Sequence, residues 1–149
     1  MDGVRYFLAC TTILVGIPLA QAQDAGAQRF DACMNAAGGV SSEMLNCGKQ
    51  EIDQWDTRLN AAYRTLSEHA RADEKTKLRN EQRAWLKHHL QETHRLAADP
   101  NNGSVAFLDS QAFELGDIKN RTLELERRVK ISREVSLWIA LPMRSDVIE

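Results

Sequence analysis

Two neighbouring segments decide the fold: residues 52–66, IDQWDTRLNAAYRTL, and residues 73–90, DEKTKLRNEQRAWLKHHL. In the first segment apolar residues recur every three or four positions, at Ile52, Trp55, Leu59 and Tyr63. Residues at this spacing share one face of an α-helix. The second segment repeats the spacing after two acidic residues, which favour the positive end of the helix dipole. The pair therefore predicts two consecutive long helices whose apolar faces pack together.

Outward from this pair, the same spacing predicts a first long helix over residues 42–70, a second over 73–97 and a third over 106–134. Ser41 or Ser42 is expected to cap the first helix, because a hydroxyl can accept a bond from a free backbone N–H. The second helix is expected to end before Pro100, which disfavours helix in the residue before it, and the Asn-Gly that follows favours a turn.

Each long helix has an expected inward stripe and an expected solvated side. The stripes are Met44, Cys47, Ile52, Trp55, Leu59, Ala62, Tyr63, Leu66 and Ala70 in the first helix; Leu78, Gln82, Trp85, Leu86, Leu90, Thr93 and Ala97 in the second; and Leu108, Ala112, Leu115, Ile118, Thr122, Leu125 and Val129 in the third. The solvated side of the first helix is expected to hold Glu51, Asp53, Gln54, Asp56, Arg58 and Arg64.

A shorter helix is expected over residues 25–37, before the turn signal Gly38-Gly39-Val40-Ser41-Ser42. Before residue 135 no clean apolar–polar alternation reaches the length of a strand. The sequence therefore predicts an all-α fold: an antiparallel bundle of three long helices plus one short N-terminal helix.

Residues 1–22 have the pattern of a cleaved secretory signal. An uncharged, mostly apolar run from Tyr6 to Leu19 follows Arg5 and ends at Ala20-Gln21-Ala22, whose small outer residues fit cleavage after Ala22. The alternative, a lipid anchor on Cys10, fits less well because Cys10 precedes most of the run. We therefore expect a periplasmic or secreted protein. After Ala22 no apolar stretch approaches 18 residues, so no membrane span is expected in the mature chain.

Cys33 and Cys47 remain after cleavage, and an even number of cysteines in an oxidising compartment predicts a disulfide. The bond would staple the short helix to the first long helix and stabilise the fold by about 3 kcal/mol in the chain-entropy model. A redox pair or metal ligands are the alternatives. They are less favoured because redox cysteines usually lie two residues apart and no further cysteine is present.

Composition narrows the classes of function. Of 149 residues, 27% are charged and 43% apolar, and the net charge is −2, which disfavours nucleic-acid binding. No catalytic or phosphate-binding motif is present, so neither an enzyme nor a cofactor is expected. His88 and Glu92 share a helix face and would form a weak metal site, but His89 and His94 point elsewhere. The three histidines are expected to be solvated or to face a partner.

Residues 23–134 are expected to form the helical domain and residues 135–149 a separate apolar tail. The tail contains Leu137-Trp138-Ile139, which would bind another exported protein if the chain is an interaction module of the bacterial envelope. No oligomeric state is predicted.

Five elements occur in order along the chain: Cys33 and Cys47, Leu59-Asn60-Ala61-Ala62-Tyr63, Leu78-Arg79-Asn80-Glu81-Gln82-Arg83-Ala84-Trp85, Gly103-Ser104, and Arg121-Thr122-Leu123-Glu124-Leu125. Together they resemble the lysozyme inhibitor LprI N-terminal-like family of small exported bacterial domains, over about residues 30–128. Members typically carry two further cysteines, which align with Thr93 and Ala112. The motif residues Leu59, Asn60, Tyr63, Leu78, Arg79, Gln82 and Trp85 are expected to preserve the packing of two helices, with Asn60 and Gln82 satisfying buried polar groups.

The resemblance implies a protein that inhibits lysozyme by binding its cleft, with lysozyme or another exported protein as partner. The expected plug is the loop Asn101-Asn102-Gly103-Ser104. The expected acidic face, which would attract a basic lysozyme, is Glu43, Glu51, Asp53 and Asp56. A non-inhibitory interaction module and a weak metal-binding protein remain the alternatives.

Overall fold

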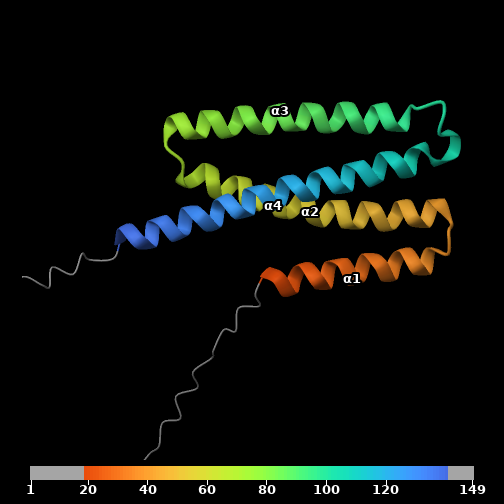
Figure 1. The fold of residues 1–149 in the computed structure, drawn as a ribbon, viewed down its shortest axis with the longest axis horizontal. Helices are drawn as coiled ribbons and strands as arrows, with labels where there is room; N and C mark the ends of the chain where they lie inside the picture. Colours follow the sequence, from red (N-terminus) through yellow and green to blue (C-terminus); the bar gives the residue numbers. More distant parts are fainter. Residues whose placement is uncertain (1–18, 141–149) are drawn as a thin grey trace, which may run out of the picture.

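The computed structural model describes residues 19–140, which form four α-helices and one short 3-10 helix with no strand among them (Figure 1). The elements are α1 (Leu19–Ala37), α2 (Ser41–His69), α3 (Ala72–Ala97), η1 (Gly103–Val105) and α4 (Ala106–Ala140). The all-α bundle predicted from the spacing of apolar residues is confirmed. The bounds of α2 and α3 lie within one residue of the expected ranges.

Short connections make each helix antiparallel to the one before it, so α2 and α4 run in the same direction (Figure 1). Helix α4 packs mainly against α2 and also against α3, whereas α1 packs against α2. The turn between α1 and α2 and the loop between α3 and α4 lie at the same end of the bundle, on the right of Figure 1. The turn between α2 and α3 lies at the other end.

The core lies where α2, α3 and α4 meet. It consists of Trp55, Leu59 and Ala62 from α2, Leu78 from α3, and Ile118 and Leu125 from α4. Leu125 is fully buried, and Thr122 beside it is equally buried and donates its hydroxyl to the backbone carbonyl of Ile118. All of these residues belong to the stripes expected from the sequence.

Parts of the expected stripes of α3 and α4 are wrong. Leu86 and Leu90 of α3 are each 46% exposed, whereas His89 between them is 6% exposed. Ala112 of α4 is also exposed. On α3 the reason is that His89 takes the inward position between the two leucines, where its ring nitrogen lies 2.7 Å from a carboxylate oxygen of Asp117 on α4.

Helices α1 and α4 are longer than expected. Helix α1 begins at Leu19 rather than residue 25, and α4 continues to Ala140 instead of ending at residue 134. Ala, Gln and Asp fill the start of α1 without Gly or Pro before Gly26, so nothing in the sequence stops the helix there. Residues 135–140 of the expected tail are therefore helical, and residues 141–149 lie outside the described part of the chain.

Most of the expected signal segment, residues 1–18, also lies outside the described part, and residues 19–22 form the start of α1. Within residues 19–140 no helix combines the length and the apolar character that crossing a membrane requires.

The turn between α1 and α2 depends on two glycines. Gly38 and Gly39 have φ of 56° and 83°, a left-handed region that side chains with a Cβ rarely adopt. The N-cap of α2 is Val40 with no side-chain hydrogen bond, so the expected cap by Ser41 or Ser42 is wrong. Because the turn folds α1 back along α2, Cys33 and Cys47 form the expected disulfide, with their Cα atoms 5.8 Å apart.

Candidate functional site

The loop between α3 and α4, expected as the plug, is held in shape by two acidic side chains. Asp99 accepts hydrogen bonds from the backbone N–H and the side-chain amide of Asn101, at 2.9 and 3.1 Å. Asn102 donates its side-chain amide to Asp109 in the first turn of α4, at 2.7 Å. Gly103 has φ of 50° and begins η1, which also contains the backbone of Ser104. The loop is thus a structured polar turn at the end of the bundle.

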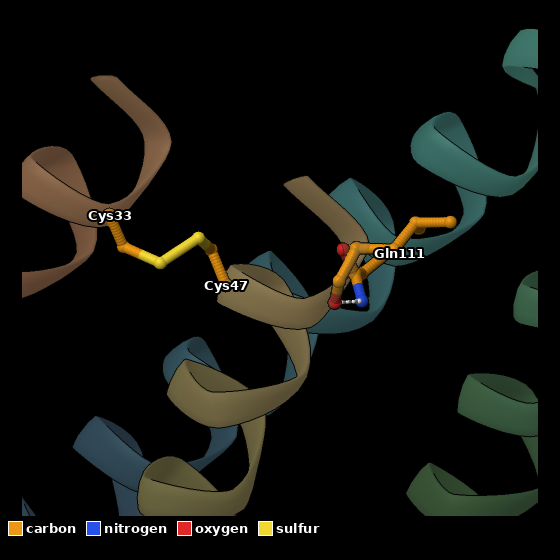
Figure 2. The surroundings of a disulfide bond; sticks show 4 residues. Cys33, Cys47 and Gln111 are labelled. Carbon is orange, nitrogen blue, oxygen red and sulfur yellow. Dashed lines mark hydrogen bonds between the residues drawn. A yellow bond between two sulfur atoms is a disulfide. The ribbon is translucent and has the colours of Figure 1, made fainter. Parts of the chain in front are cut away.

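The first part of α4, which follows the loop, is held against α2 beside the disulfide by two residues that the sequence did not single out. Gln111 of α4 donates its side-chain amide to the backbone carbonyl of Leu45, at 2.8 Å (Figure 2). Gly48 is buried there, and a Cβ at this position would overlap the amide of Gln111. The glycine therefore lets α4 approach α2 next to Cys47. The sequence signal for this contact is a glycine next to a cysteine inside a long helical pattern, because a glycine there often marks a close approach.

Exposed apolar side chains surround this loop. Val105 and Phe107 follow it and are 49% and 61% exposed, and Val40 in the neighbouring turn is 53% exposed. Phe107 precedes Gln111 by one helical turn on the same face of α4. Because α2 and α4 are parallel and Gln111 contacts Leu45, this register places Phe107 alongside the start of α2. We call Val40, Val105, Phe107 and the loop of residues 99–103 the loop end.

The expected acidic face is only partly formed. Glu43, Asp53 and Asp56 are exposed on α2, and Glu43 lies nearest the loop end. Asp53 pairs with Lys49 at 2.6 Å. Glu51 does not belong to this face: it is 9% exposed and accepts a hydrogen bond from the indole N–H of Trp55, at 2.8 Å.

Arg58 is a second residue that the expected solvated side of α2 misplaces. Its guanidinium lies 4.0 Å from the centre of the Trp55 ring and makes two hydrogen bonds to Glu126 of α4, at 2.9 and 2.8 Å. A bidentate pair of this kind fixes the relative orientation of the two side chains and also stabilises their contact. Arg58 therefore joins α2 to α4 across the edge of the core.

The residues of the two sequence motifs lie on α2 and α3, which pack mainly against α4 and not, as expected, against each other. Leu59 and Leu78 are buried in the core, and Tyr63 and Trp85 pack against it. Gln82 fulfils its expected role, because its carbonyl accepts a hydrogen bond from the Nε of Arg121 at 3.0 Å. Asn60 does not, since it is exposed and donates to Asp56 on its own helix. Arg79 is exposed on α3.

A layer of charged and polar side chains joins α3 to α4. Arg121 is 8% exposed and donates both to Gln82 and, at 2.8 Å, to Glu124. Arg128 donates to Glu81 at 2.8 Å. This hydrogen bond, with the positive charge of Arg128, holds the pKa of the Glu81 carboxyl below its usual value against the opposing effect of desolvation.

The expected solvated histidines are only partly exposed. His88 and His94 are exposed, but His89 is buried, and its Nδ1 lies 2.7 Å from a carboxylate oxygen of Asp117 on α4. The His89 ring also lies beside those of Trp85 and Phe113, at 4.9 and 6.2 Å between centroids. In the described part of the chain no three His, Cys, Asp or Glu residues cluster in a way that would hold a metal ion.

A comparison with protein-family models gives one finding: residues 33–125 match the model described as Lysozyme inhibitor LprI. The match begins at the first cysteine of the disulfide and ends at Leu125 in the core. It includes the whole loop end, leaves out most of α1 and the last part of α4, and covers more than half of the chain. No curated protein and no solved structure matches the chain.

Proposed function

Because the chain belongs to the LprI lysozyme inhibitor family, we propose that it inhibits a lysozyme by inserting its loop end into the substrate cleft. The loop end is chosen as the lysozyme-binding surface because of its own structure. A structured polar loop lies there between exposed apolar side chains, of which Phe107 at 61% is the most exposed. Exposed aromatic residues beside a polar loop are typical of protein-binding surfaces.

The inhibition would be steric and would need no chemical step. A lysozyme cleft must admit a glycan chain, so a loop held by Asp99 and Asp109 can occupy it without losing its own internal hydrogen bonds. The rigidity of the loop lowers the entropy lost on binding. Phe107 and Val105 would supply the apolar contact beside the cleft.

Acidic groups near the loop end would speed the encounter with a basic lysozyme. Glu43 on α2 and Asp109 at the start of α4 are both exposed and lie at this end of the bundle. With a net charge of −2 on the whole chain, the attraction would be local and sensitive to salt. Export to the periplasm or the medium, as expected from residues 1–22, would place the protein where it meets such enzymes.

The test is a turbidity assay of bacterial cell walls with lysozyme and the mature protein, residues 23–149. We expect the wild type to slow lysis and Phe107→Ala to weaken inhibition about tenfold, the loss typical of an interface hot spot. Leu90→Ala is the matched control, an exposed leucine on α3 away from the loop end, and it should inhibit like the wild type. Undiminished lysis at a large molar excess of wild type would reject inhibition, and full inhibition by Phe107→Ala would reject the loop end.

The exposed end of α4 favours a second function, a non-inhibitory interaction module of the envelope. Ile131, Val135 and Trp138 recur at helical spacing and are 53%, 51% and 76% exposed. A truncation after Glu134, compared with the full chain in pull-downs from periplasmic extract, tests this. The module interpretation expects partners to be lost on truncation, and it fails if the two forms retain the same partners.

A further inference from the structure

A groove between α2 and α3 is lined by the two sequence motifs and takes no part in the loop end. Its volume is about 330 Å³. Asp56, Leu59 and Tyr63 line it from α2, and Arg79, Arg83 and Trp85 line it from α3. The packing of two helices explains the buried Leu59, but it does not explain why a motif places arginine on the open side of the groove.

The two walls of the groove carry opposite charges. On the α3 side, Arg79 and Arg83 are exposed, and neither has an ion pair or a side-chain hydrogen bond within residues 19–140. On the α2 side, Asp56 accepts a hydrogen bond from the side-chain amide of Asn60 at 2.9 Å, and its carboxylate keeps free capacity to accept further bonds. The apolar lining of the groove comes from Tyr63 and Trp85, which are partly buried, with the buried Leu59 beneath them.

Two buried donors at the α3 wall have no acceptor in the described part of the chain: the indole N–H of Trp85 and the Nη2 group of Arg121. Trp85 lines the groove, and Arg121 lies behind Gln82, another lining residue, to which its Nε donates. An unsatisfied buried donor costs about 1–3 kcal/mol. A ligand that brings acceptor oxygens into the groove would reduce this cost after a small movement of the wall.

We propose that this groove binds a small peptide-like zwitterion of about dipeptide size. Its carboxylate would pair with Arg79 and Arg83, its ammonium group with Asp56, and its apolar part would lie on Tyr63 and Trp85. The volume is at the small end of ligand sites, which range from roughly 300 to 1,000 Å³. Arginine suits a carboxylate because its planar donors match the two oxygens. The proposal does not depend on lysozyme inhibition.

The test is titration of the ¹⁵N-labelled mature protein with alanyl-leucine, followed through the indole N–H resonances in NMR spectra. Trp85→Phe assigns the Trp85 resonance among the three tryptophans. We expect the free dipeptide to shift this resonance in a saturable way. The C-terminal amide of the same dipeptide should bind at least tenfold more weakly, and the N-acetylated form should also bind more weakly.

Matched variants separate a site from general charge attraction. Arg79→Gln with Arg83→Gln should weaken binding at least tenfold, whereas Arg127→Gln, an exposed arginine on α4, should leave it unchanged. All three residues are exposed, so these substitutions should preserve the fold. The proposal is overturned if the free dipeptide causes no saturable shift, if the amide binds equally well, or if the double variant binds like the wild type. The same variants are also measured in the lysis assay, so that a loss of dipeptide binding and a loss of lysozyme inhibition are recorded independently.

Discussion

The two interfaces of α4 differ in chemistry. Toward α2 the centre of the contact is apolar, because Trp55, Leu59 and Ala62 meet Ile118 and Leu125 in the core. The hydrogen bonds from Arg58 to Glu126 and from Gln111 to Leu45 lie outside this centre. Toward α3 the contact is largely polar, with hydrogen bonds from Arg121 to Gln82, from Arg128 to Glu81 and between His89 and Asp117. Apolar burial contributes free energy in proportion to area but tolerates shifts in register. Polar pairs contribute less and tolerate few shifts, because each displaced partner leaves a buried group unsatisfied.

We therefore infer a division of roles: the α2 interface supplies most of the stability, and the α3 interface sets the alignment of α3. The groove between α2 and α3 depends on that alignment, because Gln82 and Trp85 line it from α3. The following predictions test the division in order of decreasing effect.

The largest effect is expected from Leu125→Ala. This side chain is fully buried between the helices, so its truncation leaves a cavity and should lower the free energy of unfolding by about 2–5 kcal/mol. Urea denaturation followed by circular dichroism measures the change. Leu90→Ala, on an exposed leucine of α3, should change it by less than about 0.5 kcal/mol. A loss below about 1 kcal/mol for Leu125→Ala would contradict the stabilising role of the α2 interface.

Substitutions at the α3 interface are expected to lower the free energy of unfolding less, and a second substitution should restore most of it. Gln82→Leu removes the acceptor of the Arg121 Nε and should cost about 1–3 kcal/mol, because a buried charged donor is left unsatisfied. Adding Arg121→Met replaces both partners with apolar groups and should recover most of the loss. Urea denaturation of the wild type, the single variant and the double variant measures this. A double variant less stable than Gln82→Leu would show that the pair itself supplies stability.

The smallest expected effect is a dependence of the stability of the fold on pH. The pKa of Glu81 is lowered in the folded chain by its hydrogen bond from Arg128, so the folded state favours the ionised form. Its contribution is fully present above the unfolded pKa and is lost as the pH falls through the folded one. Glu81→Gln should therefore show a smaller drop in the urea midpoint between pH 7 and pH 3.5 than the wild type.

The control for this acid dependence is Glu68→Gln, which alters an exposed carboxylate at the end of α2. It should retain the acid sensitivity of the wild type. If the urea midpoint falls equally for Glu81→Gln and the wild type, Glu81 does not contribute to the acid sensitivity.

Sequence periodicity predicted the helices, the turns and the apolar interface, because these depend on local spacing and on burial of apolar side chains. It failed where a polar residue is buried with a hydrogen-bond partner, on its own helix or on another. Glu51 was expected in solvent, but Trp55 one turn later needs an acceptor for its N–H. His89 was expected in solvent, but Asp117 is 28 residues away in the chain. No local pattern encodes the pairing of His89 with Asp117, whereas the four-residue spacing of Glu51 and Trp55 is local.

The candidate site was predictable only in part for the same reason. The loop of residues 101–104 was identified from its turn-forming residues. The exposed Phe107 was missed because an aromatic residue near a helix start is more often buried. The groove was missed because its two walls come from separate motifs, which share a surface only after α2 and α3 have folded against α4.

The disulfide and the glycine contact occupy consecutive positions, Cys47 and Gly48. Neighbouring residues of an α-helix project about 100° apart, since a full turn takes 3.6 residues. Helices α1 and α4 are thus attached to α2 at a set angular offset, α1 by the disulfide at Cys47 and α4 by the Gln111 side chain that lies against Gly48. One residue inserted between these positions would swing one partner around α2 relative to the other. Natural variation in chain length should therefore collect in the end loops and be excluded from this turn of α2.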